Sequence, residues 1–460
     1  MFGAKKIHIL GISGTFMAGL ALIAKQSGIT VSGHDNDCYP PMKDQLAAND
    51  INVKLGYADS DLPPADLYIV GNSIKRGNPL FESILLLGLP YCSGPEWLYH
   101  NVLRHKWVIA ISGTHGKTTT SSMLTWILES LGYHPSFLIG GIPENMGCSA
   151  RLTASNVFVI EADEYDTALF DKRPKFIHYR PKTLVINNLD FDHADIYSSL
   201  AEISKQFCNL IKTVPSDGSV IALDSDSAVA EVLKKGCWSK QQSLSTDKDS
   251  SNWFYSGNED FSTVMIGYAK RDLATFNLKV FGEHNAKNAC MALVAANHFG
   301  VPISNAASAL NSFLGVKRRL ELKGTYAGVR CYDDFGHHPT AIESVLKSLK
   351  VGLAPENKIF AIVELGSYTL RSGLMVSQLQ KALSYSSMAY LLLASGVDSS
   401  YDWTKWADQH ESVEIGFGME DISKNICYTV RPGDIVISFS SRNIVKIHEL
   451  LRDKLLPAIC

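Results

Sequence analysis

The sequence lacks three features that would each indicate a particular class of protein. Its nine cysteines are scattered and include no C-x-x-C pair, which argues against a disulfide framework or a zinc site. It has no long run of lysine or arginine and a net charge of only −3, so no nucleic-acid partner is expected. No segment offers about 18 uninterrupted apolar residues, so no membrane span is expected. These absences favour a cytoplasmic protein whose thiols are buried in a reducing compartment.

The N-terminus resembles a secretory signal at first sight. Lys5 and Lys6 precede an apolar stretch that runs to residue 24. Glycine, serine and threonine interrupt this stretch at turn-like spacing, and no small-residue cleavage site follows it. We therefore predict a strand, a tight turn and a helix in place of a signal peptide.

The chain is long enough for several domains. Its 460 residues, 46% hydrophobic and 19% charged, are typical of globular protein, and domains of about 100–200 residues suggest three units. Short apolar runs alternate with helical patterns, which predicts α/β domains with parallel sheets. We expect an N-terminal Rossmann-like domain, a central P-loop ATPase-like domain and a C-terminal Rossmann-like domain, at residues 1–104, 105–314 and 315–460. The polar, irregular residues 235–275 are expected to form an insertion or a surface hairpin.

The strongest motif joins an apolar strand at 106–113 to a helix at 118–131. Glycines in such a turn let backbone N–H groups approach a phosphate closely. Lys117 would lie on the β and γ phosphates of ATP, and the Thr118 hydroxyl would coordinate Mg²⁺. The turn is a shortened Walker motif, because Ile111 stands where the strict motif has glycine. An ordinary strand–turn–helix corner is the alternative, but it leaves the Lys-Thr-Thr run unexplained. The nucleotide-binding candidates of this turn are Gly113, Thr114, His115, Gly116, Lys117, Thr118 and Thr119.

Two acidic segments follow buried strands in the same unit. Carboxylate oxygens are the ligands that a hard divalent cation prefers. Glu161 lies at the end of the strand at 157–163, so we predict that it binds Mg²⁺, with a solvated acidic loop as the alternative. His193 lies among aspartates after the strand at 183–188 and is a candidate ligand for a second cation, although a lone histidine is more often structural.

Two weaker patterns are also typical of nucleotide-binding sites. A turn from Gly11 to Met17 stands between a strand and a helix, and Asp35 closes the next strand about 20 residues later, where a ribose contact is often found. A tight turn without a ligand is the alternative. The segment from Gly282 to Asn288 opens an alanine-rich helix, where side-chain amides would read an adenine edge or Asn285 would cap the helix.

The third unit adds basic and histidine-rich segments. An arginine of Lys317–Arg319 would stabilise charge on a transferring phosphoryl group, with a solvated basic turn as the alternative. Asp334 would accept a hydrogen bond from a ribose hydroxyl. His337 and His338 lie at a strand end, where open α/β sheets place ligands, although a structural pair of histidines is also possible.

Taken in order, these motifs resemble those of the Mur ligase family. The order is GxxGTxM, GTHGKTT, EADEYD, DHAD, GxHNxxN, RR and DDFGHHPT, and it spans the chain from Gly11 to Thr340. The resemblance implies an ATP-dependent and Mg²⁺-dependent ligase, which phosphorylates a carboxylate and joins an amine to the acyl phosphate. Further stretches, such as residues 39–42 and 170–173, resemble the family member of cell-wall recycling that joins UDP-N-acetylmuramate to the tripeptide L-alanyl-γ-D-glutamyl-meso-diaminopimelate. L-alanine is the alternative acceptor, and a monomer or weak homodimer is expected.

The resemblance also implies roles for individual residues. The residues expected to take part in catalysis are Lys117, His193, Arg319 and His337. Those expected to bind ATP beyond the phosphate-binding turn are His284, Asn285, Asn288, Arg319 and Asp334. The metal ligands are expected to be Thr118, Glu161 and His193. Those expected to bind the two substrates are Gly11, Ser13, Gly14, Thr15, Phe16, Met17, Asp35, Ser73, Asn78, His337 and Arg371.

Two loops of the third unit depart from the pattern of that recycling enzyme. It usually reads EPRS after a strand, whereas Glu364–Ser367 read ELGS here, with Arg371 nearby. It usually has the glycine-rich SNGGFGG, whereas Ser440–Lys446 read SSRNIVK here. Both loops would face the amine substrate, so these changes bear on the choice of acceptor and leave the chemistry intact.

Two other classes of protein remain open on the sequence. A dehydrogenase built on the N-terminal unit would use a nucleotide cofactor, but it leaves the GTHGKTT turn unexplained. A nucleotide-binding protein without ligase activity would keep the ATP contacts while lacking functional substrate loops.

Overall fold

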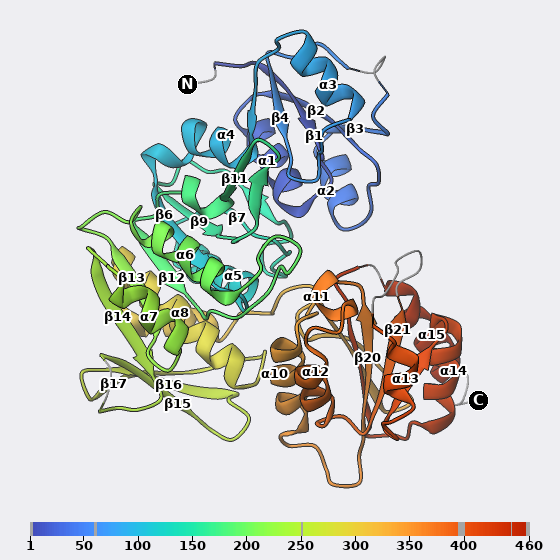
Figure 1. Ribbon diagram of the computed structural model, residues 1–460. Coiled ribbons are helices and arrows are strands. Elements are labelled where there is room, and N and C mark those ends of the chain that lie inside the picture. The colour runs from blue at the N-terminus through green and yellow to red at the C-terminus, as the bar shows by residue number, and fades with distance from the viewer. Residues whose placement is uncertain (1–2, 59–61, 250–251, 394–400, 443, 457–460) are drawn as a thin grey trace.

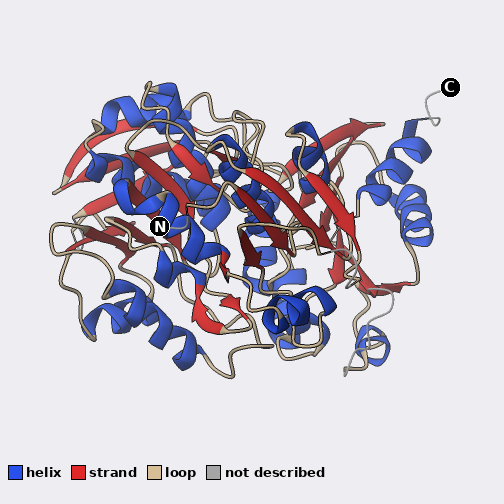
Figure 2. Cartoon of the chain, turned by 90° about the horizontal axis from the view of Figure 1, so that it is seen from above, coloured by secondary structure: helices blue, strands red, loops and turns tan. Residues whose placement is uncertain are grey.

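The three parts of the chain each build their own β-sheet in the computed structural model, which describes residues 3–58, 62–249, 252–393, 401–442 and 444–456. In Figure 1 the N-terminal sheet lies at the top in blue, the central sheet at the left in green, and the C-terminal sheet at the lower right in orange and red. Figure 2 shows helices flanking the strands throughout the molecule. The predicted α/β architecture with mainly parallel sheets is confirmed.

The N-terminal sheet is parallel, with strand order β3-β2-β1-β4-β5. Its strands are β1 (Lys6–Leu10), β2 (Thr30–Asp35), β3 (Asn52–Leu55), β4 (Leu67–Val70) and β5 (Tyr91–Ser93). Its helices are α1 (Thr15–Gln26), α2 (Met42–Ala48), α3 (Pro79–Leu86) and α4 (Gly94–Asn101), followed by a short 3₁₀ helix (Leu103–His105). The apolar run at the N-terminus therefore forms β1 and α1, as the sequence predicts.

The central sheet has ten strands in the order β17-β16-β15-β14-β13-β12-β6-β9-β7-β8. Its strands are β6 (Trp107–Ser112), β7 (Ser136–Leu138), β8 (Ala150–Arg151), β9 (Val157–Glu161), β12 (Thr183–Ile186), β13 (Ser219–Leu223), β14 (Lys240–Ser245), β15 (Trp253–Gly257), β16 (Thr263–Tyr268) and β17 (Arg271–Asn277). A separate hairpin pairs β10 (Asp166–Ala168) with β11 (Asp171–Pro174). The helices of this part are α5 (Lys117–Ser130), α6 (Leu200–Ile211), α7 (Ser227–Lys234), α8 (Glu283–Phe299) and α9 (Ile303–Leu310), with a 3₁₀ helix at Lys175–His178.

Residues 235–275 include the expected hairpin, because β15, β16 and β17 pair antiparallel in turn, but they belong to the central sheet and form no separate insertion. They extend the central sheet through β14, β15, β16 and most of β17, and only the last two pairings, β15 with β16 and β16 with β17, are antiparallel. Trp253, Phe254 and Tyr255 are buried, and so are some of the polar side chains that made this segment look irregular, among them Gln242 and Ser245 of β14. The sheet therefore continues beyond the part that the sequence predicts.

The C-terminal sheet has the order β18-β19-β23-β20-β21-β22, and only the β18–β19 pair is antiparallel. Its strands are β18 (Glu321–Tyr326), β19 (Val329–Asp334), β20 (Ile359–Leu365), β21 (Met388–Leu393), β22 (Val413–Gly416) and β23 (Ile435–Phe439). Its helices are α10 (Pro339–Lys350), α11 (Tyr368–Arg371), α12 (Val376–Leu383), α13 (Trp403–Ala407), α14 (Met419–Thr429) and α15 (Val445–Leu455).

The sequence argued against disulfide bonds and membrane-spanning helices, and the structure bears on both features. All cysteines within the described ranges are free thiols, and Cys460 lies outside those ranges. Every described helix is too short or too polar to cross a lipid bilayer.

Candidate active site

The turn between β6 and α5 has two positions where any side chain would strain the backbone and meet close neighbours. Gly116 precedes α5 in the left-handed conformation (φ 79°), and a Cβ atom there would lie 2.4 Å from Asn288 Oδ1. Gly113 has φ 117°, and its Cβ would lie 2.8 Å from the backbone oxygen of Asn188. Both glycines let the backbone of the turn lie close to neighbouring protein segments. A phosphate-binding turn requires the same close approach of its backbone to the phosphate.

Asparagines from two other segments hold this turn in place, and two of them were not predicted from the sequence. Asn188 Oδ1 accepts a hydrogen bond from the backbone N–H of His115 (2.8 Å). Asn187 Nδ2 donates to Thr120 Oγ1 (3.0 Å), whose hydroxyl donates to Asn288 Oδ1 (3.2 Å). The signal for Asn187 and Asn188 was their place at the end of the predicted strand at 183–188. Asn288 was predicted to contact adenine, but its side-chain oxygen is directed at the turn.

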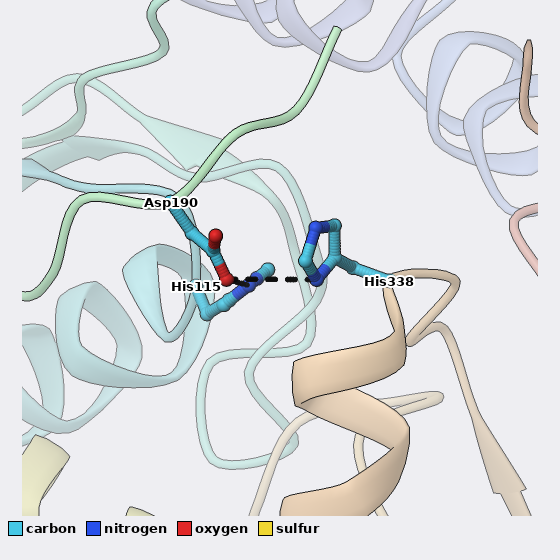
Figure 3. Close-up of side chains that lie close together, drawn as sticks. All are labelled: His115, Asp190 and His338. Carbon is cyan, nitrogen blue, oxygen red and sulfur yellow. Dashed lines mark ion pairs between the residues drawn. The ribbon is translucent and has the colours of Figure 1, made fainter. Parts of the chain in front are cut away.

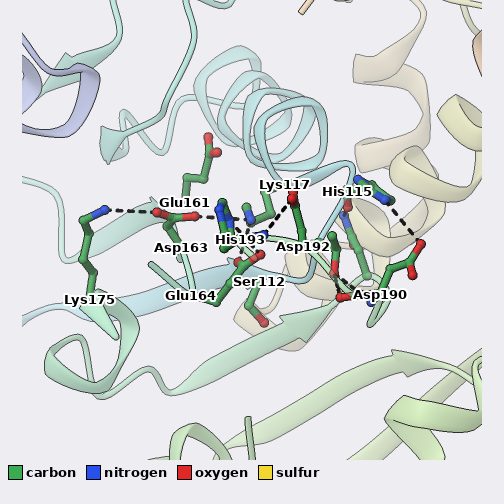
Figure 4. Close-up of polar contacts among 12 residues, drawn as sticks. Ser112, His115, Lys117, Glu161, Asp163, Glu164, Lys175, Asp190, Asp192 and His193 are labelled. Carbon is green, nitrogen blue, oxygen red and sulfur yellow. Dashed lines mark hydrogen bonds and ion pairs between the residues drawn. The ribbon is translucent and has the colours of Figure 1, made fainter. Parts of the chain in front are cut away.

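Lys117 lies buried between two acidic side chains (Figure 4). Its Nζ atom lies 2.6 Å from Glu164 Oε2 and 3.4 Å from Asp163 Oδ1. Burial alone would lower the pKa of Lys117, but the negative charges of Glu164 and Asp163 outweigh it and hold that pKa above its usual value. Asp163 also pairs with Lys175 Nζ at 3.0 Å. The turn therefore carries a protonated lysine. The carboxylates that hold it belong to Glu164 and Asp163, whereas the sequence had singled out Glu161.

Thr118 connects the turn to a metal-ligand candidate and to the C-terminal part of the chain. Its hydroxyl donates to Glu161 Oε1 (3.0 Å), and the other carboxylate oxygen of Glu161 accepts from the backbone N–H of Gly140 (2.8 Å). Arg319 Nη2 donates to the Thr118 hydroxyl (3.1 Å). Three predicted residues from segments far apart in the sequence are thus in direct contact.

His193 lies beside Glu164 and Asp163, and ligand atoms of these three residues lie within 4.8 Å of one another. His193 Nε2 is 3.5 Å from Glu164 Oε1. Burial lowers the pKa of His193, but the hydrogen bond and charge of Glu164 outweigh burial and raise that pKa to about 9. The neighbouring Asp192 accepts from the backbone N–H of His193 (2.7 Å) and from the Thr369 hydroxyl (3.2 Å), which joins this cluster to the C-terminal part.

A cavity of about 470 Å³ lies between the central and C-terminal parts of the chain. The predicted ATP-binding residues that line it are His115, Gly116, Thr119, His284, Asn285, Asn288, Arg319 and Asp334. Asp334 is fixed there by backbone N–H groups of Leu320 (2.7 Å) and Gly336 (2.6 Å), and its burial raises its pKa. Asn285 does not cap α8, because Gly282 holds the cap position and Asn285 Nδ2 donates back to Phe281 O (3.0 Å).

One wall of the cavity is a contact between the central and C-terminal parts (Figure 3). The hydroxyl of Thr340 donates to Asp190 Oδ2 (2.8 Å), and the ring nitrogen His338 Nε2 lies 3.1 Å from Phe191 O. His115 Nε2 and His338 Nδ1 lie 3.8 and 4.0 Å from the same Asp190 oxygen. The sequence singled out His338 but gave no sign that Asp190 and Thr340 would meet across 150 residues.

Most of the residues predicted to bind substrate in the N-terminal part lie at or beside the turn between β1 and α1, and Asn78 is the exception. Gly11 has φ 79°, and its Cβ would lie 2.9 Å from Ser73 Oγ. Asp35 Oδ2 accepts from the backbone N–H of Ser13 (2.8 Å), so the carboxylate at the end of β2 fixes the turn. Asn78 instead caps α3, where its Oδ1 accepts from the backbone N–H of Phe81 (3.1 Å). The remaining residues of the predicted turn lie at the start of α1, namely Gly14, Thr15, Phe16 and Met17.

The two substrate residues predicted in the C-terminal part follow different strands, His337 after β19 and Arg371 after β20. His337 follows β19, with its Nδ1 atom 3.2 Å from Phe335 O; burial lowers the pKa of His337, and the charge of Asp192 opposes that shift. Arg371 ends α11, and its guanidinium lies 5.5 Å from the centre of the Tyr368 ring.

Comparison with known proteins agrees with this arrangement. Three family models match the chain: "Mur ligase family, catalytic domain" at residues 6–106, "Mur ligase middle domain" at 111–296, and "Mur ligase, glutamate ligase domain" at 318–442. The UDP-N-acetylmuramate–L-alanyl-γ-D-glutamyl-meso-2,6-diaminoheptandioate ligase of Haemophilus influenzae is 43% identical over 98% of this chain and 99% of its own length. The ligase of the same name from Escherichia coli K12 is 42% identical, with 98% of both chains covered.

A solved structure extends the likeness to three dimensions. The murein peptide ligase of Psychrobacter arcticus is 37% identical, covers 98% of both chains and has a TM-score of 0.78. From the three matched family models and the identity across nearly the whole chain, the protein belongs to the Mur ligase family and is a ligase.

Proposed function

We propose that this ligase joins the carboxylate of UDP-N-acetylmuramate to the amine of L-alanyl-γ-D-glutamyl-meso-diaminopimelate, with ATP as the source of energy. The observation that carries this proposal is the identity of 43% and 42% to two relatives named for that reaction, over 98% of the chain. The site supports it, because a phosphate-binding turn, acidic groups and a second substrate region lie on different parts of one molecule. We place the process in peptidoglycan recycling in the cytoplasm, where ATP is available, and expect a monomer or weak homodimer.

The turn and the adjoining cavity fit a nucleoside triphosphate. His115 lines this cavity, and its buried Nε2 atom has no hydrogen-bond partner within the described residues, so we propose that it contacts the nucleotide. Arg319 and Asp334 line the same cavity and supply a cation and a buried carboxylate for phosphate and ribose. ATP would supply the phosphoryl group that turns the carboxylate into an acyl phosphate.

The oxygen donors around Thr118 fit Mg²⁺. A hydroxyl and a carboxylate that lie 3.0 Å apart at the end of the phosphate-binding turn are hard ligands of the kind this cation prefers. Mg²⁺ there would neutralise charge on the transferring phosphoryl group. We propose Thr118 and Glu161 as its ligands, and His193 as a ligand of a second cation at the cluster that also contains Asp163 and Glu164.

The chain's own residues then act mainly by placement and charge. Lys117, protonated because Glu164 and Asp163 surround it, is proposed to move onto the β and γ phosphates. Arg319 already touches Thr118 and would stabilise negative charge on the transferring group. His337 would face the incoming amine, whose attack gives a tetrahedral intermediate that loses phosphate.

The remaining substrate contacts are assigned by region. We propose that the turn from Gly11 to Met17, with Asp35 and Ser73, holds the UDP moiety. Asn78 Oδ1 caps α3, and we propose that the amide N–H groups of Asn78 contact the substrate. We place the domain boundaries at 104/105 and 314/315, so that the UDP-sugar, ATP and the peptide each have a domain of their own.

A competition experiment tests the proposed acceptor. The protein is incubated with ATP, Mg²⁺, UDP-N-acetylmuramate and equal amounts of tripeptide and L-alanine, and the products are identified by mass spectrometry. We expect the UDP-muramoyl-tripeptide to dominate. A product mass that corresponds to addition of L-alanine alone, or no product at all, would contradict the proposal.

A further inference from the structure

Two loops of the C-terminal sheet meet at one edge, beside the proposed reaction site. β20 and β23 are adjacent and parallel, so the loops that follow them leave from the same edge of the sheet. The loop after β20 contains Gly366, and the loop after β23 contains Arg442. Open parallel sheets bind their ligands at this carboxyl-terminal edge.

The backbone of Arg442 is held firmly while its side chain is exposed. Arg318 Nη2 donates to the backbone oxygens of Arg442 (2.6 Å) and Ser440 (2.9 Å). The backbone N–H of Arg442 donates to Ser440 Oγ at 2.9 Å. Substituting the Arg442 side chain would therefore leave the contacts that shape this loop in place.

The guanidinium of Arg442 lies over the neighbouring loop. A Cβ atom on Gly366 would be in van der Waals contact with Arg442 Nε, at 3.6 Å, and would lie 3.3 Å from Glu364 Oε2. The acidic residue at this edge, Glu364, is buried and accepts a hydrogen bond from the Ser440 hydroxyl. Among the described ion pairs, none involves Arg442, whereas the nearby Lys446 pairs with Glu420.

Contacts on both sides connect these loops to the reacting groups. Arg318, which holds the Arg442 loop, directly precedes Arg319, the residue that contacts the Thr118 hydroxyl. On the other side, Thr369 in the helix after β20 donates to Asp192, next to His193. An acceptor whose amine reaches the acyl phosphate would therefore extend along the edge where Arg442 lies.

We infer that Arg442 binds a carboxylate of the acceptor peptide and so favours a peptide with several carboxylates over a single amino acid. This inference rests on the proposed function, because the proposed tripeptide carries three carboxylates and L-alanine carries one. A planar guanidinium pairs with a carboxylate through two parallel N–H···O bonds, which gives both affinity and orientation. Arg371 places a second guanidinium on the loop and helix after β20.

The first test is Arg442→Gln, which removes the charge and keeps most of the side-chain length. Hydrogen bonds to charged groups predict that the KM for the tripeptide rises roughly tenfold to a hundredfold. The KM values for ATP and UDP-N-acetylmuramate and the value of kcat should change little, which also shows that the variant is folded. Arg442→Lys should restore part of the loss, and the matched control Arg452→Gln, at an exposed arginine of α15 that pairs with Asp453, should behave as the wild type.

The second test asks whether the partner is a carboxylate. Three tripeptides, each with a different carboxylate replaced by a carboxamide, are compared as acceptors for the wild type and Arg442→Gln. We expect one carboxamide to raise the wild-type KM while leaving the KM of Arg442→Gln unchanged. If every carboxamide weakens both proteins equally, or if Arg442→Gln keeps the wild-type KM, the inference is wrong although the proposed function stands. Absence of any product from the wild type and the unmodified tripeptide would instead refute the proposed function itself.

Discussion

Replacement of Lys117 by methionine removes a buried charge while keeping a similar side-chain volume. Lys117 Nζ lies 2.6 Å from Glu164 Oε2, and the Glu164 side chain is only 1% exposed, so the variant leaves a buried carboxylate without its main cation. Breaking a buried ion pair from one side costs about 3–5 kcal/mol, and we expect about 3 kcal/mol of unfolding free energy because His193 remains beside Glu164. If Lys117 also neutralises the transferring phosphoryl group, kcat should fall by about 10²–10³.

A second substitution separates these two effects. The double variant Lys117→Met/Glu164→Gln no longer contains the unpaired carboxylate, so it should recover most of the lost stability and none of the activity. Chemical denaturation measures stability, and ADP release that depends on both substrates measures activity. Lys182→Met, which affects an ion pair with the exposed Asp217, is the matched control and should change neither. Near-normal turnover of the single variant would refute the phosphate role, and a double variant no more stable than the single one would refute the ion-pair reasoning.

Three further predictions concern the metal, the turn and acid stability. Glu161→Gln should raise the Mg²⁺ concentration for half-maximal activity about tenfold or more, and an unchanged titration would contradict its role as a ligand. Gly116→Ala should cost roughly 1–3 kcal/mol in denaturation, because its Cβ would meet Asn288 Oδ1 at 2.4 Å, and more than Gly132→Ala, where φ is 81° but the space is open. Burial holds the pKa of His8 at about 3, below the usual 6.5 that applies in the unfolded chain, so stability should fall as the pH drops from about 6.5 towards 3. Between pH 7 and 5 the His8→Asn variant should lose about 2 kcal/mol less than the wild type in denaturant titrations, and equal losses would refute this assignment.

The sequence predicts most of the strands and the phosphate-binding turn, because both depend on local patterns. β6 and α5 begin and end within one residue of their expected bounds. The turn could be identified from glycines and Lys117 alone. Asp35 was also identified as a candidate because it lies about 20 residues after the first turn in the sequence. In the structure its carboxylate contacts that turn.

The parts that the sequence misses depend on which distant segments meet. The partner of Lys117 is Glu164, 47 residues away, and neighbouring acidic residues gave no reason to prefer it over Glu161. The pairing of Asp190 with Thr340 joins two segments 150 residues apart and requires the relative placement of two sheets. The strands within 235–275 were not predicted because polar residues, including the buried Gln242 and Ser245, interrupt the apolar pattern around the buried aromatic residues.

The fate of one oxygen atom tests the central claim that a phosphoryl group is handed to the muramate carboxylate. UDP-N-acetylmuramate labelled with ¹⁸O in that carboxylate is incubated with ATP, Mg²⁺ and tripeptide, and the released inorganic phosphate is analysed by mass spectrometry. Because the carboxylate oxygen that bonds to phosphorus leaves with it when the amine displaces phosphate, the account predicts one ¹⁸O atom in each phosphate formed. Phosphate without label, released together with the amide product, would contradict it.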